Sequence, residues 1–299
     1  MSNSFIDKIA KKIILLIVVL LLSFLLLFLT YIFGMGIRYL SLKSILLPSQ
    51  ITGSGGGIRD QLFNSVYMLL LTLIISLPLS IGSGIYLAEF APKNKLVDFV
   101  QNMIDVLSYM PSIVVGLFIY LIIVIKFNIG FSILAGSLAL TIFNLPILTA
   151  NIKNAFCNIS QAQRDAGKAL GLSEWNLIKG ILLPQTIPTI IVAVVLSAGR
   201  IFGEAAALIY SSGQSAPLLN YANWNPFCMD SPLNIMRPAE TLSVYIWKIN
   251  SEGLKPDAEK ISFCSILILV GVILLFDLVA HFLGNYLHQK FIYGKKNNE

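Results

Sequence analysis

The sequence predicts an all-α integral membrane protein with six transmembrane helices, and three observations carry this prediction. First, 56% of the 299 residues are hydrophobic, only 12% are charged, and the mean hydropathy is +0.80. Soluble domains are typically about 25% charged, so this charge cannot cover the surface of a globule. Second, the apolar residues form uninterrupted runs, whereas barrel strands alternate apolar and polar residues. Third, basic residues flank these runs, as in membrane helices.

The composition also excludes several classes of protein. It does not fit an ordinary cytoplasmic enzyme, a disordered chain or a secreted disulfide scaffold. The net charge of +6 would suggest nucleic acid as the partner of a soluble protein. Here topology signals and anionic membrane lipid explain it more simply, so no nucleic-acid partner is expected. Cys157, Cys228 and Cys264 share no short spacing, which predicts neither a metal site nor a disulfide framework.

The first apolar run, Ile13 to Phe33, has 21 residues without a charge. At about 1.5 Å per residue it crosses a hydrocarbon core of about 30 Å. The run is too long for a cleaved signal peptide and lacks a small-residue cleavage site. We therefore expect a retained helix at 13–35, behind a cytoplasmic N-terminus at 1–12.

Five further apolar runs lie at about 63–89, 110–126, 130–150, 186–211 and 261–287. Six spans place both termini on one side. With both inside, the inner segments carry twelve Lys and Arg residues and the outer segments eight. This modest bias agrees with the basic residues near both ends, Lys290, Lys295 and Lys296 among them, and predicts a cytoplasmic tail at 289–299.

Three connections stand out between the runs. The outer loop 36–62 contains Gly53 to Gly57, a flexible linker rather than a phosphate-binding loop, because no predicted strand precedes it. The inner connection 151–185 is polar yet favours helix. The outer connection 212–260 is rich in Pro and aromatic residues and holds a short amphipathic stretch, Glu240 to Ile249, suited to the membrane interface or to contact with a binding protein.

Local chemistry shapes the inner connection into a helical hairpin. A helix over about 153–170 is expected to end at Gly171, which adopts the left-handed conformation at little cost. Ser173 can cap a second short helix with Glu174 in its first turn. We expect Trp175, Ile178 and Leu182 to form an apolar stripe there, which a cytosolic partner could bind in a groove.

This hairpin closely resembles the EAA loop of ABC importer permeases, which reads Glu-Ala-Ala, three residues, Gly, nine residues and Ile-x-Leu-Pro. Asp165-Ala166-Gly167 stands for the first element here, with Gly171 and then Ile181 to Pro184 at the expected spacing. The resemblance implies a type I (MetI-like) permease core at 63–288, whose loop docks on an ATPase subunit. It assigns ATPase coupling to Asp165, Ala166, Gly167, Gly171, Ile181, Leu183 and Pro184.

Nucleotide hydrolysis must then come from another chain, because no Gly-x4-Gly-Lys-Ser/Thr sequence occurs here. We therefore expect a non-enzymatic subunit with no catalytic residue and no cofactor of its own.

The rare ionisable residues inside spans are candidates for the substrate pathway. Each costs about 2.5–3.5 kcal/mol at mid-helix on insertion scales. Arg200 and Glu204 lie four apart in the fifth span and are expected on one face. Two interpretations stay open: they neutralise each other and fix helix packing, or Arg200 faces the pathway, binds an oxyanion and is held by Glu204.

Further stretches resemble the phosphate importer permeases. There are five such stretches. Residues 108–118 contain Pro111 and Ser112, and the others are 198–207, Ile85 to Ala91, Trp224 to Phe227 and Thr241 to Trp247. One departure is Ala205-Ala206-Ala207, where the family commonly has Thr-Ala-Pro, which puts the local helix geometry in doubt. The resemblance implies a second permease, two ATPase subunits and an external phosphate-binding protein as partners, in a bacterial plasma membrane.

Weaker candidates complete the set. Pro111 and Ser112 either line the pathway or only kink the third span. Asp277 and His281 share a face near the inner end of the last span and suit packing better than a proton relay. Glu89 is expected to be solvated or to pair helices.

Two alternatives to a phosphate permease remain. The cargo could be another oxyanion, such as molybdate or sulfate. A proton-coupled secondary carrier could instead use Glu204, Asp277 and His281. A membrane enzyme fits poorly, since no nucleophile–base pair is evident.

Overall fold

The computed structural model describes residues 3–50, 56–215, 217–252 and 256–292. Within these ranges the chain is helical and contains no strand. Gly53 to Gly55 of the expected linker, Lys295 and Lys296 lie outside the described residues, and so does the Lys290 side chain.

Five helices are long and apolar enough to span a membrane, and a sixth span arises if one bent pair counts as one. The five are α1 (Asn3–Tyr39), α3 (Arg59–Ile85), α6 (Ile133–Cys157), α9 (Leu183–Gly203) and α12 (Ala258–Ile292). The first part of the bent pair is α4 (Lys95–Ser108). Its second part, Ser112–Lys126, consists of α5 (Ser112–Ile119) and the segment that follows it, and the angle between the two parts is 99°. The predicted all-α membrane fold is therefore confirmed, with the third span broken rather than straight.

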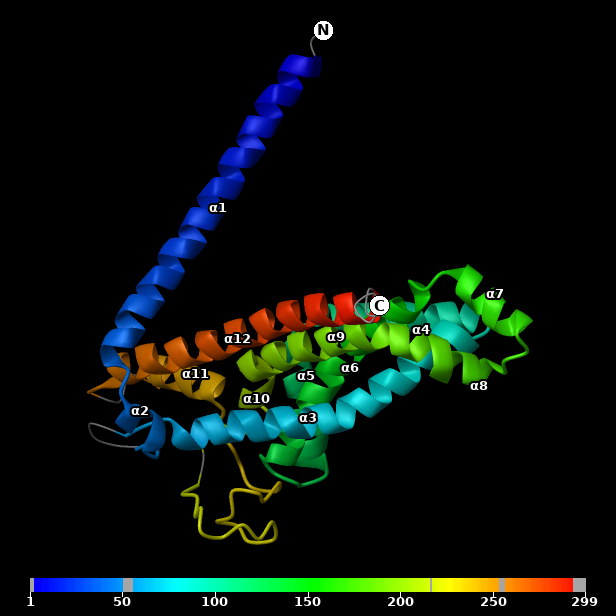
Figure 1. Ribbon diagram of the computed structural model, residues 1–299. Helices are drawn as coiled ribbons and strands as arrows, with labels where there is room; N and C mark the ends of the chain where they lie inside the picture. Colours follow the sequence, from blue (N-terminus) through cyan, green and yellow to red (C-terminus); the bar gives the residue numbers. More distant parts are fainter. Residues whose placement is uncertain (1–2, 51–55, 216, 253–255, 293–299) are drawn as a thin grey trace, which may run out of the picture.

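Four of the long helices form the bundle. In Figure 1, α3, α6, α9 and α12 run along one direction, and α6 packs against α3 and α9 while α12 packs against α9. A helical hairpin closes one end, made of α7 (Gln161–Ala169) and α8 (Glu174–Leu177). The other end carries α2 (Leu42–Leu46) and α11 (Leu242–Glu252). We call these the hairpin end and the α11 end.

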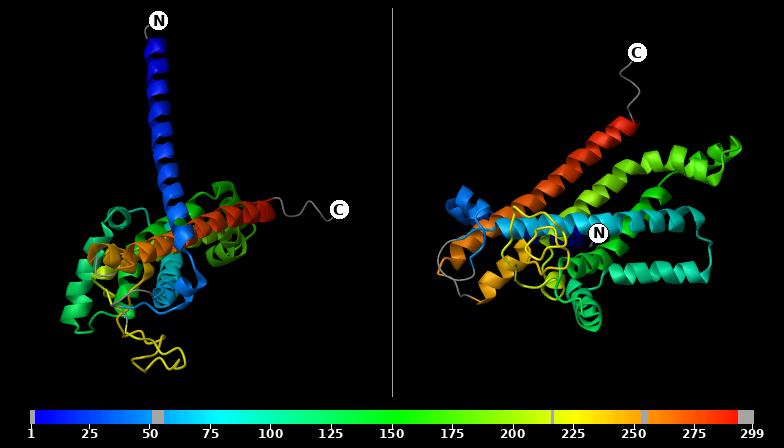
Figure 2. Two further views of the ribbon diagram at one scale, coloured as in Figure 1. Left: turned by 90° about the vertical axis from the view of Figure 1, so that its left-hand side faces the viewer. Right: turned by 90° about the horizontal axis from the view of Figure 1, so that it is seen from below.

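The first helix stands apart from this bundle. Figures 1 and 2 show α1 projecting away from the other helices. Apart from Ser23, every side chain from Ile13 to Phe28 is exposed. Contact is confined to the last turns, where Tyr31 packs edge-on against Phe263 of α12, with ring centroids 5.6 Å apart. Lipid or another chain must cover the remaining apolar surface.

Three short π-helical segments extend or join the helices. They are η1 (Tyr86–Phe90) after α3, η2 (Tyr120–Lys126) after α5, and η3 (Ile178–Leu182) between α8 and α9. Such segments are rare and recur at functional sites. Polar caps fix helix starts: Asn94 Oδ1 accepts from the Val97 amide at α4, and Ser132 Oγ accepts from the Ala135 amide at α6.

The α11 end is more ordered than the expected interfacial helix. Leu242, Val244 and Tyr245 of α11 are buried in the main core with residues of α3, α6 and α9. Headgroup contact is therefore wrong for Tyr245, although Trp247 is exposed. The reason is that α11 turns its apolar side into the bundle rather than toward the membrane surface. A second core, at the hairpin end, joins Leu148 and Ile152 of α6 to Leu177 and Ile178.

Candidate functional site

The hairpin forms by the local rules expected of it. Gly171 has φ of +74°, the left-handed conformation that glycine adopts most easily. Its amide donates to the Lys168 carbonyl, and the Leu172 amide donates to the Gly167 carbonyl. This pair of bonds is a Schellman motif, so the predicted helix end at Gly171 is confirmed.

The second helix of the hairpin begins where predicted. Ser173 Oγ accepts a hydrogen bond from the Asn176 amide at 3.3 Å, and Glu174 lies in the first turn. From Glu174 the chain runs through α8, η3 and α9 to Gly203 as one long helical segment. Any movement of α8 is therefore carried directly into a membrane-spanning helix.

The expected apolar stripe is only partly correct. Ile178 and Leu182 are buried in the hairpin-end core, whereas Trp175 is 59% exposed. The π-helical turn shifts these residues out of simple α-helical spacing. The large apolar side chains that the hairpin offers to a partner are instead Leu170 and Trp175.

The motif residues occupy two environments. Asp165 and Ala166 are exposed on α7, while Gly167 is buried; a Cβ at Gly167 would collide with Leu177 Cδ1. The missing side chain at Gly167 thus allows close packing of α7 on α8. Three further motif residues are half-buried where α9 begins: Ile181, Leu183 and Pro184.

The single helix expected over about 153–170 is wrong. α6 extends to Cys157, and α7 starts only at Gln161. Between them the Asn158 and Ile159 amides close the last turn on Asn154 and Phe156. The break has a visible cause, because Arg164 of α7 folds back and donates hydrogen bonds to the carbonyls of Phe156 and Ile159.

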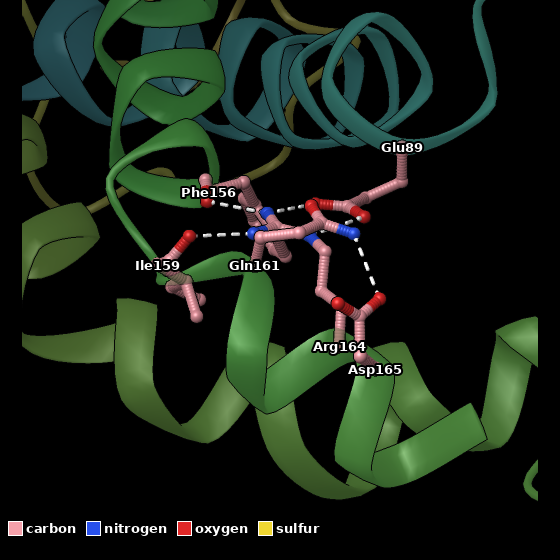
Figure 3. A network of polar contacts seen from close by, with 6 residues as sticks. All are labelled: Glu89, Phe156, Ile159, Gln161, Arg164 and Asp165. Carbon is pink, nitrogen blue, oxygen red and sulfur yellow. Dashed lines mark hydrogen bonds and ion pairs between the residues drawn. The ribbon is translucent and has the colours of Figure 1, made fainter. Parts of the chain in front are cut away.

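Arg164 also pairs with Glu89, as Figure 3 shows. Its Nη2 lies 2.7 Å from Glu89 Oε1 and its Nε 3.2 Å from Oε2, a two-pronged ion pair. The side chains are only 13% and 11% exposed. The hydrogen bond to Glu89 raises the pKa of Arg164 above its ordinary value. Of the two expectations for Glu89, helix pairing is confirmed.

Arg200 does not pair with Glu204. α9 ends at Gly203, and Glu204 has ψ of 130°, an extended conformation that breaks the four-residue spacing. The Arg200 guanidinium instead lies over the Phe143 ring of α6, with Cζ 4.3 Å from the ring centroid. Arg200 is exposed, and no ion pair to it occurs among the described residues. The expected mutual neutralisation is therefore wrong.

Glu204 has a different contact. Its Oε1 accepts from the Ala207 amide at 3.2 Å, and its carbonyl accepts from Ser243 Oγ at 2.6 Å. The carboxylate thus stabilises the start of α10 (Ala206–Ile209). α9 ends here because Glu204 adopts an extended conformation, without a proline in the Ala205–Ala207 stretch.

Pro111 and Ser112 lie where the third span breaks. Pro111 precedes α5 as its N-cap without a side-chain hydrogen bond, and Ser112 is the first residue of α5. Of the two alternatives for Pro111 and Ser112, the bend is observed, with 99° between α4 and the segment Ser112–Lys126. The Val114 amide donates to the Pro111 carbonyl at 3.0 Å, and the helix dipole makes the start of α5 a favourable environment for negative charge.

Asp277 and His281 make no hydrogen bond or ion pair with each other in the described chain. His281 Nε2 lies 3.2 Å from Asn285 Nδ2, and both Asp277 and His281 are exposed on α12.

A polar cluster at the α11 end was not predicted. Arg237, only 1% exposed, donates to Asn64 Oδ1 at 2.7 Å and to the Pro232 carbonyl at 2.9 Å. Burial lowers the pKa of Arg237 to about 10. Glu240, also buried, binds Gln61 and Lys248. These contacts join the long connection to the first turns of α3.

An all-helical membrane bundle with an EAA-type hairpin at one end defines the permease subunit of an ABC importer. The family described as "Binding-protein-dependent transport system inner membrane component" matches residues 80–293, and the chain belongs to this family.

Two curated relatives cover most of the chain. Probable ABC transporter permease protein YqgI of Bacillus subtilis is 43% identical over 290 residues, 97% of this chain and 99% of that protein. Phosphate transport system permease protein PstA of Yersinia pestis is 32% identical over 257 residues, 85% of this chain and 81% of that protein.

Solved structures share the MetI-type fold. A bacterial alginate ABC transporter, crystallised with an alginate pentasaccharide-bound periplasmic protein, has a TM-score of 0.66 at 15% identity, over 95% of this chain and 96% of that chain. An inward-facing form of the MetNI methionine ABC transporter has a TM-score of 0.56 at 16% identity, over 77% of this chain and 94% of that chain.

Proposed function

We propose that this permease subunit carries phosphate and forms half of the translocation pathway of an ATP-driven phosphate importer, as a PstA-like subunit. The identity to PstA of Yersinia pestis supports this cargo. So do the stretches 85–91, 224–227 and 241–247, which resemble phosphate permeases.

The observation that carries the proposal is the environment of Arg200. A guanidinium in a membrane helix is costly unless something compensates it, by about 2.5–3.5 kcal/mol at the helix centre on insertion scales. Phe143 covers its face and no carboxylate pairs with it among the described residues. Its N–H edges are therefore free to donate to an oxyanion, which guanidinium binds in a planar, two-pronged fashion.

The break between α4 and α5 adds a second favourable feature. A helix start within a membrane suits anionic cargo, because the helix dipole favours negative charge there. We place Pro111 and Ser112 along the pathway for this reason, with Glu204 shaping its wall at the start of α10 rather than holding Arg200.

The hairpin would couple this pathway to ATP. In the proposed complex the chain pairs with a PstC-like permease, a PstB-like ATPase dimer and an external phosphate-binding protein. The ATPase subunits bind the exposed face around Asp165, Ala166, Leu170 and Trp175. Their closure on ATP moves the hairpin and switches the pathway between inward- and outward-facing states, while ATP is hydrolysed only by the partner subunits.

Orientation follows from this docking. The hairpin end faces the cytoplasm of a bacterial cell, and the α11 end faces outward. Both termini are then cytoplasmic, which agrees with the excess of basic residues in the inner segments.

Reconstituted uptake tests the proposal. The complete complex in proteoliposomes should take up radiolabelled phosphate when ATP is supplied, with little competition from sulfate or molybdate. Arg200→Ala should abolish uptake while the complex still co-purifies; lost assembly would instead assign Arg200 to packing.

Two outcomes would favour the alternatives. If sulfate or molybdate inhibits uptake and phosphate does not, the cargo is another oxyanion. Proton-coupled uptake by the chain alone, without any ATPase, would make it a secondary carrier.

A further inference from the structure

The two helices of the hairpin, α7 and α8, connect to the membrane helices in different ways. On one side α8, η3 and α9 form a continuous helical segment from Glu174 to Gly203. On the other side the helix is interrupted at 158–160, between α6 and α7. A displacement of the hairpin therefore reaches α9 through the backbone, but it has no continuous helix through which to reach α6 or α3.

Arg164 spans this interruption. From α7 its guanidinium donates to the Phe156 carbonyl at 2.8 Å and to the Ile159 carbonyl at 2.5 Å, at the end of α6. The same group binds both oxygens of Glu89, in η1 at the end of α3 (Figure 3). One side chain thus joins α7 to two membrane helices that the backbone leaves unconnected to it.

The hydrogen bonds and the ion pair of Arg164 hold α7 in a fixed direction relative to α3 and α6. Planar guanidinium fixes the direction of several hydrogen bonds at once, which an ammonium group cannot do. Charge-assisted bonds are roughly twice as strong as neutral ones, and little water competes for a pair that is only 13% and 11% exposed. The positive charge also suits the carbonyl end of α6.

Apolar packing also links the hairpin to the bundle, because Leu177 and Ile178 share a core with α6, but this packing comes from α8 and η3 and not from α7. α7 packs chiefly against α8, and Gly167 is its only buried residue. Polar contact between α7 and the bundle therefore depends on Arg164.

We propose that Arg164, positioned by Glu89, transmits the displacement of the hairpin to α3 and α6, so that these helices move together with α9 during transport. This inference rests on the proposed docking of the ATPase on the hairpin. Arg164 is a positioning residue, and its loss uncouples ATP hydrolysis from transport without releasing the ATPase.

The test compares Arg164→Lys and Glu89→Gln with the parent complex. Lys153→Gln is the matched control, because Lys153 is a half-buried cation near the same end of α6 whose amine donates to Gln101 at 2.8 Å and does not touch the hairpin. Three quantities are measured: co-purified ATPase, ATP hydrolysis, and phosphate taken up per ATP hydrolysed.

We expect normal co-purification and continuing hydrolysis in both variants. Uptake per ATP should fall about tenfold or more, the factor that corresponds to losing one charge-assisted hydrogen bond. The control should keep the parent ratio. An unchanged ratio in Arg164→Lys overturns the proposal, and so does loss of the ATPase, which would make the junction only a fold-stabilising contact.

A second readout does not depend on the cargo. Spin labels are placed at the exposed positions Leu70 of α3 and Leu275 of α12, which packs against α9. In the parent complex ATP should change their distance little, because α3 moves together with α9, whereas Arg164→Lys should produce a larger ATP-dependent change. An equal change in both complexes overturns the inference about Arg164. If the parent complex binds no ATPase or takes up no phosphate, the proposed function fails instead.

Discussion

The Arg200 guanidinium lies over the Phe143 ring, with Cζ 4.3 Å from the ring centroid, and joins the last turn of α9 to α6. An aromatic face attracts a cation without using its N–H donors. A carboxylate partner would have occupied those donors. The contact with Phe143 therefore leaves the N–H donors of Arg200 available, as the proposed contact with an anion requires.

Removing the ring should weaken cargo recognition. Phe143→Leu is expected to raise the KM for phosphate uptake about 2- to 30-fold, which corresponds to losing a cation–π interaction of about 0.5–2 kcal/mol. Phe143→Trp should stay near the parent value. Uptake kinetics of the reconstituted complex measure this, and equal KM values for Leu and Trp would show that only packing volume matters at this position.

Glu204 should act through its oxygen rather than its charge. Glu204→Gln keeps an acceptor for the Ala207 amide and should transport almost normally. Glu204→Ala loses the acceptor and should destabilise the start of α10 by about 1 kcal/mol. Uptake rates and thermal unfolding in detergent compare the two. Inactivity of Glu204→Gln would restore a charge-based role.

Gly171 should be essential to the hairpin. Its φ of +74° strains a β-branched side chain by about 1–3 kcal/mol. Gly171→Val should therefore distort the hairpin and release the ATPase during purification. Gly180→Ala is the matched control, because a Cβ at Gly180 meets nothing within 4 Å. Normal co-purification and uptake with Gly171→Val would contradict the docking assignment.

The α11 end should lose stability at alkaline pH. The Tyr221 hydroxyl donates to Asp60 Oδ1 at 2.8 Å. Burial, reinforced by this bond, raises the pKa of Tyr221 to about 12. Because the unfolded pKa is about 10, the resulting stability is complete below pH 10 and is lost as the pH rises through 12.

Tyr221→Phe tests this dependence. The variant should be less stable below pH 10 and should lack the parent's loss of stability between about pH 10 and 12. Fluorescence of Trp224, which packs edge-on against Tyr221, follows the transition. Identical alkaline profiles for the two proteins would show that Tyr221 does not hold this connection.

The hairpin could be predicted well because its chemistry is local. A helix end at Gly171 and a cap at Ser173 depend on residues within one turn, and both were confirmed. The apolar run ends at about residue 150, whereas α6 continues to Cys157. The run was too short a guide because Lys153 and Asn154 are polar, and a helix can continue beyond the apolar stretch that crosses the membrane.

The contacts of the site were harder to predict. The expected pairing of Arg200 with Glu204 presupposed an unbroken helix, and one extended residue removed the spacing on which it depended. Arg164 and Glu89 lie 75 residues apart, and no short-range pattern links them. A lone carboxylate at the end of an apolar run was the only signal that this position had a distant partner.

Because α1 stands apart from the bundle, it has a different role in the subunit from the other membrane helices. Within the described residues, α1 touches the other helices only over its last turns, from Tyr31 onward, and therefore contributes little to their folding. Its exposed apolar length instead adds lateral surface with which the subunit is embedded among its neighbours in the membrane. Sequence change along α1 is thereby constrained by that surrounding layer, whereas change in α3, α6 and α9 is constrained by the transport machinery itself.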